Sequence, residues 1–132
     1  MPAQIEQRMH SVNGRKVPHE MLIPSRAMVE AKIAAIAPGA VGSLAEIRKA
    51  LAADTGADAC CPVTTQRHLR AIAADVAARR SATPYWRVVD PETPTARHLA
   101  GGADFVRDQL RAERSSAKKS PERARPSARR SS

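Results

Sequence analysis

The sequence predicts a mainly α-helical domain with a three-helix core, a short strand and a closing C-terminal helix, flanked by disordered arms. Three observations favour this fold class. Apolar residues recur three or four positions apart in successive segments, the spacing of helices buried on one face. Helix-capping residues precede two of these segments. The 132 residues include only three aromatic side chains, which suits small, closely packed helices better than a large sheet.

Composition divides the chain into three parts. Residues 1–22 mix Pro, Gly, charges and scattered apolar residues without a period, so we expect a flexible arm. Residues 23–113 contain the periodic segments and are long enough for one modest core. Residues 114–132 are a low-complexity mixture of Ser, Arg, Lys, Pro and Ala, which predicts a disordered basic tail.

The first two helices have clear start and stop signals. Ser25 is placed to cap the first helix, and Pro38-Gly39 ends it. Ser43 and Glu46 form a capping box for the second helix, which ends near Gly56. The predicted inward residues are Val29, Ile33 and Ile36 in the first helix and Leu44, Ile47 and Leu51 in the second.

The third helix follows Pro62, with Thr64 or Thr65 as its cap. Its inward residues are Leu69, Ile72 and Val76, and its other side carries Gln66, Arg67 and Arg70. A short helix, a connection and a second helix with a basic outer face form the pattern of a helix-turn-helix, whose second helix enters a DNA groove. The alternative is an ordinary amphipathic helix with exposed arginines.

The segment after the third helix changes character. "YWRVV" is aromatic and β-branched, which predicts a short strand, and "DPETP" predicts a turn. Gly101-Gly102 then precede a last helix. Its apolar residues are Phe105, Val106 and Leu110.

Positive charge is concentrated at the C-terminal end. The formal charge is +9, and residues 114–132 hold seven Lys or Arg against the single acid Glu122, so this segment carries +6 and the rest +3. We expect a polyanionic partner, held by the tail through phosphate neutralisation without sequence preference. The alternative is a solvated tail that only aids solubility.

The N-terminal 21 residues lack a continuous apolar stretch, and no segment reaches the roughly 20 apolar residues of a membrane span. We therefore expect a cytoplasmic, nucleoid-associated protein. Cys60 and Cys61 are adjacent, which strains a disulfide, and no His pair has ligand spacing, so no metal and no cofactor is expected. Because Cys61 precedes a helix start, a reactive thiolate is an alternative to a small buried side chain.

Four segments, in order, carry a resemblance to a known family: "APGAVGSLAEI", "TTQRHLRAIAADV", "PYWRVV" and "HLAGGADFVRDQL". Together they resemble the DNA-binding domain of the alkylguanine-DNA alkyltransferases and of their non-enzymatic relatives, the alkyltransferase-like proteins. The likeness spans about residues 25–113. It implies a winged helix-turn-helix, followed by a Pro-Cys-His-Arg-Val motif, a turn, a Gly-Gly segment and a closing helix.

The resemblance bears on enzyme activity through one motif. Pro84 and Arg87 match it, whereas Tyr85 stands where the enzymes keep a nucleophilic cysteine and Trp86 where they keep a histidine. The enzymes move an alkyl group from guanine onto a thiolate, and a phenol of pKa about 10 supplies no such nucleophile at neutral pH. We therefore expect no enzyme activity at this motif. The alkyltransferase-like proteins also lack the cysteine and bind alkylated bases without repairing them.

The resemblance also implies contact residues. Arg67 takes the place of the arginine that fills the gap left by a displaced base, with Arg70 as competitor, whereas Leu44 replaces a phosphate-contacting tyrosine. The link between the second and third helices is longer than the family's turn. The predicted DNA contacts are Ser43, Thr64, Thr65, Gln66, Arg67 and Arg70. The predicted base pocket is formed by Pro84, Tyr85, Trp86, Arg87, Gly101 and Gly102.

The aromatic pair has two interpretations. Base-on-aromatic stacking contributes about 1–3 kcal/mol, enough to offset much of the cost of extruding a base. In a strand, however, neighbouring side chains point to opposite faces, so at most one of Tyr85 and Trp86 would line a pocket, and both are also natural core residues.

Three function classes follow. The leading hypothesis is a non-enzymatic, monomeric protein that binds double-stranded DNA, recognises alkylated or extruded bases and works with a DNA repair protein. The second is an architectural or regulatory DNA binder whose pocket is closed by Trp86. The third is a thiol enzyme that works through Cys60 or Cys61.

Overall fold

The computed structural model describes residues 3–119 and begins, at its N-terminal end, with a β-hairpin. Strand β1 (Gln4–Val12) pairs antiparallel with β2 (Arg15–Ile23). The backbone φ is 50° at Asn13 and 77° at Gly14, as a two-residue hairpin turn requires. The prediction of a flexible arm over residues 1–22 is therefore wrong from Gln4 onward. Most hairpin side chains are exposed, so no alternation of buried and polar residues marks the strands.

A two-residue strand, β3 (Ala59–Cys60), joins the hairpin to the helices. It pairs parallel to β2, which gives the order β1-β2-β3. The Asp58 N–H donates to the Glu20 carbonyl at 2.9 Å, and the Glu20 N–H donates back to the Asp58 carboxylate at 2.8 Å. The long link between the second and third helices therefore anchors the hairpin, and the domain is mixed α/β rather than mainly α.

The starts of the first two helices and the end of the second agree with their sequence signals, whereas the first helix ends before the predicted Pro38-Gly39 stop and leaves Ile36 outside it. Helix α1 (Arg26–Ala34) begins where the Ser25 hydroxyl accepts the Met28 N–H at 3.2 Å. Helix α2 (Leu44–Thr55) begins where the Ser43 hydroxyl accepts the Glu46 N–H at 3.1 Å, and it ends at Gly56 with a φ of 75°. Local capping is enough to set these boundaries.

Helix α3 (Pro62–Ala77) confirms the predicted third helix but not its predicted cap. It begins at Pro62, with Cys61 as an N-cap that makes no side-chain capping bond. Leu69 and Ile72 are fully buried, and Val76 packs against the core while half-buried. Because the helix starts three residues earlier than a cap at Thr64 requires, and four earlier than a cap at Thr65 requires, both threonines lie inside its first turn.

The predicted strand "YWRVV" is a short 3-10 helix, η1 (Tyr85–Val88). Its bonds span three residues, as when the Arg87 N–H donates to the Pro84 carbonyl at 3.1 Å. Within residues 3–119 no strand pairs with its backbone, so burial overrides β propensity here. The predicted turn is confirmed by the Thr93 N–H, which donates to the Asp90 carbonyl at 3.1 Å, and the short helix α4 (Pro94–His98) follows it.

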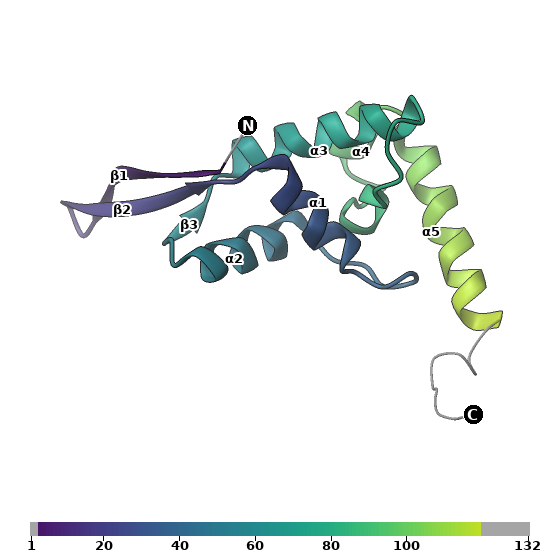
Figure 1. Ribbon diagram of the computed structural model, residues 1–132, viewed down its shortest axis with the longest axis horizontal. Helices are drawn as coiled ribbons and strands as arrows, with labels where there is room; N and C mark the ends of the chain where they lie inside the picture. Colours follow the sequence, from purple (N-terminus) through teal and green to yellow (C-terminus); the bar gives the residue numbers. More distant parts are fainter. Residues whose placement is uncertain (1–2, 120–132) are drawn as a thin grey trace.

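Helix α5 (Gly102–Lys119) is the predicted closing helix, with Val106 and Leu110 buried. It includes residues 114–119, so the predicted disordered tail is wrong for these six residues, whereas residues 120–132 lie outside the described part. Figure 1 shows the hairpin projecting from one end of the helical body, α3 running along one side, and α5 at the opposite end. Within residues 3–119, no helix is both long and apolar enough to cross a membrane.

Candidate nucleic-acid interface

The exposed side of α3 carries two arginines. Arg67 and Arg70 are exposed and line a shallow groove of about 450 Å³ along the first half of the helix, together with Gln66, Pro62 and Val63. In the described part of the chain neither guanidinium forms an ion pair. Three of the predicted DNA contacts, Gln66, Arg67 and Arg70, are therefore brought together on one open surface.

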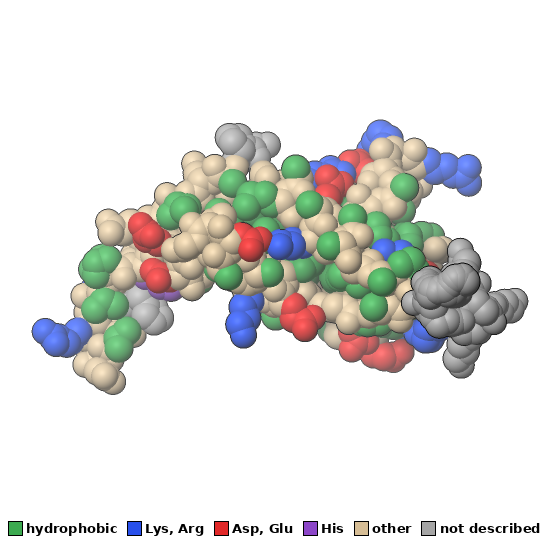
Figure 2. Space-filling model, turned by 60° about the horizontal axis from the view of Figure 1, so that its bottom comes forward, with side chains coloured by type: hydrophobic (Ala, Val, Ile, Leu, Met, Phe, Trp, Pro, Cys, Tyr) green, Lys and Arg blue, Asp and Glu red, His purple; other side chains and the backbone are tan. Residues whose placement is uncertain are grey.

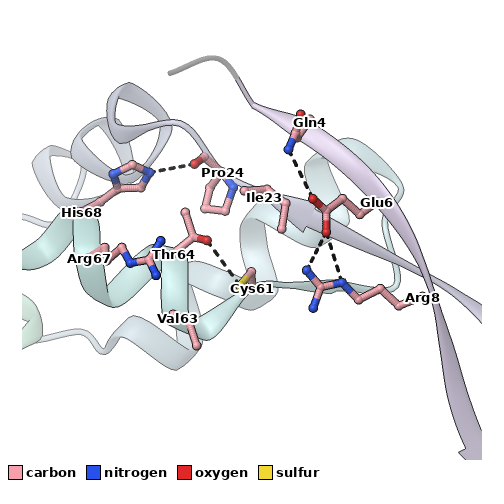
Figure 3. Close-up of a pocket in the computed structure, with 10 residues that line it drawn as sticks. All are labelled: Gln4, Glu6, Arg8, Ile23, Pro24, Cys61, Val63, Thr64, Arg67 and His68. Carbon is pink, nitrogen blue, oxygen red and sulfur yellow. Dashed lines mark hydrogen bonds and ion pairs between the residues drawn. The ribbon is translucent and has the colours of Figure 1, made fainter.

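A larger pocket of about 520 Å³ lies between the hairpin and the start of α3. Figure 3 shows the Arg8 and Arg67 guanidinium groups extending into it from opposite sides, with Cys61 drawn between them. Thr64, another predicted contact, lines the same pocket. Arg67 belongs to both the pocket and the groove, so the two hollows form one continuous surface.

The basic side chains that line this pocket differ in their partners. Arg8 pairs with Glu6 two positions earlier on β1, and this ion pair is solvent-exposed. On α3, the Nε2–H of His68 donates to the Pro24 carbonyl at 2.8 Å, which orients the ring and ties the helix to the end of β2. Arg67 has no ion-pair partner among the described residues, and the helix N-terminus adds a partial positive charge. The site is suited to binding an anion such as phosphate.

The two cysteines lie in different surroundings, although both are buried and unpaired. Burial raises the pKa of the Cys60 thiol, which lies in the core 3.7 Å from the Thr65 hydroxyl. Burial also acts to raise the pKa of Cys61. There, hydrogen bonds from the Thr64 hydroxyl and from the Val63 and Thr64 amides, together with the Arg8 charge, outweigh burial and lower the pKa. Cys61 is the more acidic thiol.

Two predicted DNA contacts lie elsewhere. Thr65 is fully buried, and its hydroxyl donates to the Cys61 carbonyl at 2.8 Å, so its expected role in DNA contact is wrong. Ser43 is occupied in capping α2 and lines a separate small hollow that contains Lys32 and Ile36. The α3 arginines do not line that hollow.

Tyr85 is part of the core. Its side chain is fully buried, and its hydroxyl donates to the Ala100 carbonyl at 3.1 Å. The ring stacks on Phe105, with centroids 6.1 Å apart and planes 19° apart, and meets Trp86 edge-on at 5.8 Å. Burial raises the pKa of the Tyr85 phenol. Of the two aromatic side chains, Tyr85 is enclosed and Trp86 is half-buried.

Arg87 is a structural residue rather than a pocket residue. Its Nη2 lies 2.7 Å from Glu113 Oε2, its Nε donates to the same carboxylate, and its Nη1 donates to the Ile36 carbonyl at 2.6 Å. Burial acts to raise the pKa of Glu113, but the hydrogen bonds and charge of Arg87 lower it overall. The motif arginine thereby ties η1 to α5 and to the segment after α1.

A hollow of about 330 Å³ does lie beside Tyr85. Of the predicted base pocket it brings together Tyr85 and Gly101, whereas Pro84, Trp86, Arg87 and Gly102 do not line it. Sequence reasoning missed Arg79, which also lines it and has a positive φ of 62°. It also missed Arg8, for which the Asn13-Gly14 turn was the available signal. The other residues that line the hollow beside Tyr85 are Val76, Ala77, Ala100 and Phe105.

Comparison with known proteins adds no relative. No protein-family model matches the chain, and neither a curated protein nor a solved structure matches it.

Proposed function

We propose that the chain is a non-enzymatic protein that binds double-stranded DNA with the exposed face of α3 and the adjoining hairpin. The observation that carries this proposal is the pair Arg67 and Arg70, which are exposed on the same groove and form no ion pair within residues 3–119. They lie three positions apart on a helix, so they are neighbours on one face. A duplex major groove about 12 Å wide admits such a helix.

The pocket between β1 and α3 supplies a phosphate contact in this proposal. A DNA phosphate placed there meets Arg67, the Thr64 hydroxyl and the N-terminal end of α3, with Arg8 on the opposite wall. Contacts of this kind fix the register of a protein on the duplex but carry little sequence information. The basic segment after Lys119 adds non-specific affinity.

The proposal excludes alkyl transfer at Tyr85. The phenol is fully buried, its hydroxyl is used by the Ala100 carbonyl, and burial raises its pKa. A base would have to displace core side chains to reach it. The same burial favours the architectural or regulatory type of DNA binder over one that presents Tyr85 to a base.

One observation favours a second function, recognition of an extruded base. The hollow beside Tyr85 and Gly101 has about 330 Å³, at the lower end of the roughly 300–1,000 Å³ common for small-molecule sites. Phe105 and Arg79 line it, an aromatic and a cationic side chain of the kinds that stack on bases. An alkylated guanine turned out of the duplex is the corresponding ligand.

The binding test compares Arg67→Ala and Arg70→Ala with Arg97→Ala, a control at an exposed arginine on α4. Fluorescence anisotropy with an unmodified duplex measures affinity over a salt series. We expect each α3 variant to weaken binding and to reduce the salt slope by about 1, as loss of one phosphate contact does. The control should change neither. Equal losses in all three variants would refute α3 as the contact helix.

The base-recognition test uses two duplexes that differ only in an alkylated guanine, at one fixed salt concentration. Tighter binding of the modified duplex, lost when Ala77→Leu fills the hollow, supports extruded-base recognition. Equal affinity for both duplexes assigns the chain to the architectural or regulatory class. Arg67→Ala, measured on both duplexes, separates general affinity from the preference for the lesion.

A further inference from the structure

The outer edge of β1 is long and unprotected. Strand order β1-β2-β3 makes β1 an edge strand of nine residues, and its pairing with β2 runs without a bulge. In the described part of the chain, its backbone makes hydrogen bonds only within that ladder. The strand contains no Pro or Lys, residues that commonly protect edges from pairing with another chain.

The hydrogen-bonding direction of this edge follows from the hairpin. A two-residue turn is closed by a hydrogen-bonded pair, here Val12 and Arg15, and such pairs alternate along the ladder. Gln7 and Ile5 therefore direct their N–H and C=O groups outward. Their partners on β2 confirm this, because the carbonyls of Glu20 and Leu22 accept bonds from the β3 side.

The exposed side chains of β1 complement a second copy of the same strand. Ile5 is 48% exposed and Met9 is 61% exposed, and Figure 2 shows hydrophobic side chains on the outlying part of the molecule. Glu6 and Arg8 offer opposite charges on the other side of the strand. An antiparallel pair of β1 strands centred on Gln7 sets Ile5 opposite Met9, and Glu6 opposite Arg8, each twice.

The neighbouring registers lack this match. Centring on Glu6 places two carboxylates opposite each other, and centring on Arg8 places two guanidinium groups opposite each other, which is unfavourable across strands. Only centring on Gln7, among these three, pairs opposite charges. It also places the outward backbone groups of Gln7 against those of the second Gln7, as a hydrogen-bonded pair requires.

We propose that the chain forms a symmetric dimer by antiparallel pairing of two β1 strands about Gln7. The product is a continuous sheet that contains both hairpins and places two copies of α3 in one particle. This inference stands apart from DNA binding and replaces the expectation of a monomer.

The first test measures mass by sedimentation equilibrium of the full chain, without DNA. Wild type should approach twice the 14.2 kDa chain mass as concentration rises. Gln7→Pro removes an N–H that β2 does not use, so it should give a monomer, while the matched control Gln7→Ala should remain dimeric. A monomeric wild type, or a dimeric Gln7→Pro, overturns the proposal.

The second test uses charge complementation. Glu6→Arg alone and Arg8→Glu alone each place like charges across the interface, so each should dissociate at least tenfold more readily than wild type. Mixed in equal amounts, the two variants pair opposite charges at every position and should regain the dimer mass. Mixing does not change the like charges within each variant's own strand. Recovery of the dimer on mixing therefore reports the contact between the two copies. Absence of recovery overturns the register.

Discussion

The Arg87 side chain has a defined structural task. The Arg87 side chain is 10% exposed and that of its partner Glu113 is 14% exposed, so the ion pair is largely removed from water. A third bond to the Ile36 carbonyl satisfies the remaining donors on one side. Charges buried in this way are tolerated only as a set, because removing one partner leaves the other unsatisfied.

Glu113→Ala is therefore expected to destabilise the fold. We expect a loss of about 3 kcal/mol in the free energy of unfolding, the lower end of the range for breaking a buried pair. Glu92→Ala, which breaks an exposed ion pair with Arg107, is the matched control and should change stability little. Urea denaturation measures both. A Glu113 variant as stable as the control would contradict the structural role of Arg87.

The same pair predicts a dependence on pH. Because the pKa of Glu113 is lowered in the folded chain, its contribution to stability is fully present above the pKa of an unfolded glutamate, about 4.3. That contribution declines as the pH falls through the lower, folded pKa. Between pH 6 and pH 3, wild type should lose more stability than Glu113→Gln, which has no such proton to bind. Parallel curves of stability against pH for the two proteins would contradict this prediction.

The two cysteines are expected to react at different pH. The pKa of Cys61 is lowered and that of Cys60 is raised, and only Cys61 lines the large pocket. Iodoacetamide should label Cys60→Ser at lower pH than Cys61→Ser, since the thiolate is the reacting form. Mass spectrometry of the native proteins follows the labelling. Equal labelling of both variants would show that the helix start does not acidify Cys61.

At the scale of elements, sequence signals predicted those helix boundaries that depend on interactions between neighbouring residues. The caps at Ser25 and Ser43 and the stop at Gly56 depend on neighbouring backbone groups, so α1 and α2 were predictable. Segment η1 was not predictable, because Tyr85, Arg87 and Val88 are buried and no strand of the described part pairs with it. Thr65 was misassigned because the start of α3 at Pro62 turns it inward, which depends on β3 and its pairing with β2.

The hairpin shows a different limit. Its strands project from the body, so burial imposes little pattern on their sequence, and the Asn13-Gly14 turn is the remaining signal. The candidate site contains residues that local sequence patterns predict and one residue that they do not. Arg67 and Arg70 were predictable as the outer face of an amphipathic helix, whereas Arg8 reaches them only through the sheet.

Gly14→Val tests the hairpin as a separate element. A β-branched residue is strained at a φ of 77°, so the turn should open. Amide hydrogen exchange should accelerate near the turn, while α1 to α3 stay protected because the hairpin tip does not contribute to the core. Ser11→Val, at an ordinary strand position, is the control. Global loss of protection would contradict the independence of the tip.

At the scale of the whole molecule, positive charge is divided between the α3 face and the C-terminal segment. Residues 120–132 contain four arginines and Glu122, a net charge of +3. Ending the chain at Lys119 leaves α5 and the Arg87–Glu113 pair in place, so the fold should persist. The slope of log affinity against log salt should fall by at most about 3.6 in magnitude, at 0.9 per phosphate contact for the four arginines removed.

A truncated chain that loses all affinity for DNA would show that the segment after Lys119 binds by itself. Retained affinity with a smaller slope agrees with two contributing surfaces. Circular dichroism of the truncated chain checks that the helices remain.

The most direct test of α3 as the DNA-contacting helix is a map of amide chemical shifts during titration of the full chain with a short duplex. We predict that the largest changes fall on Thr64, Gln66, Arg67 and Arg70 of α3, and on Arg8 of the hairpin wall. Changes confined to α2, α4 or the residues after Lys119, with α3 unmoved, would contradict this account.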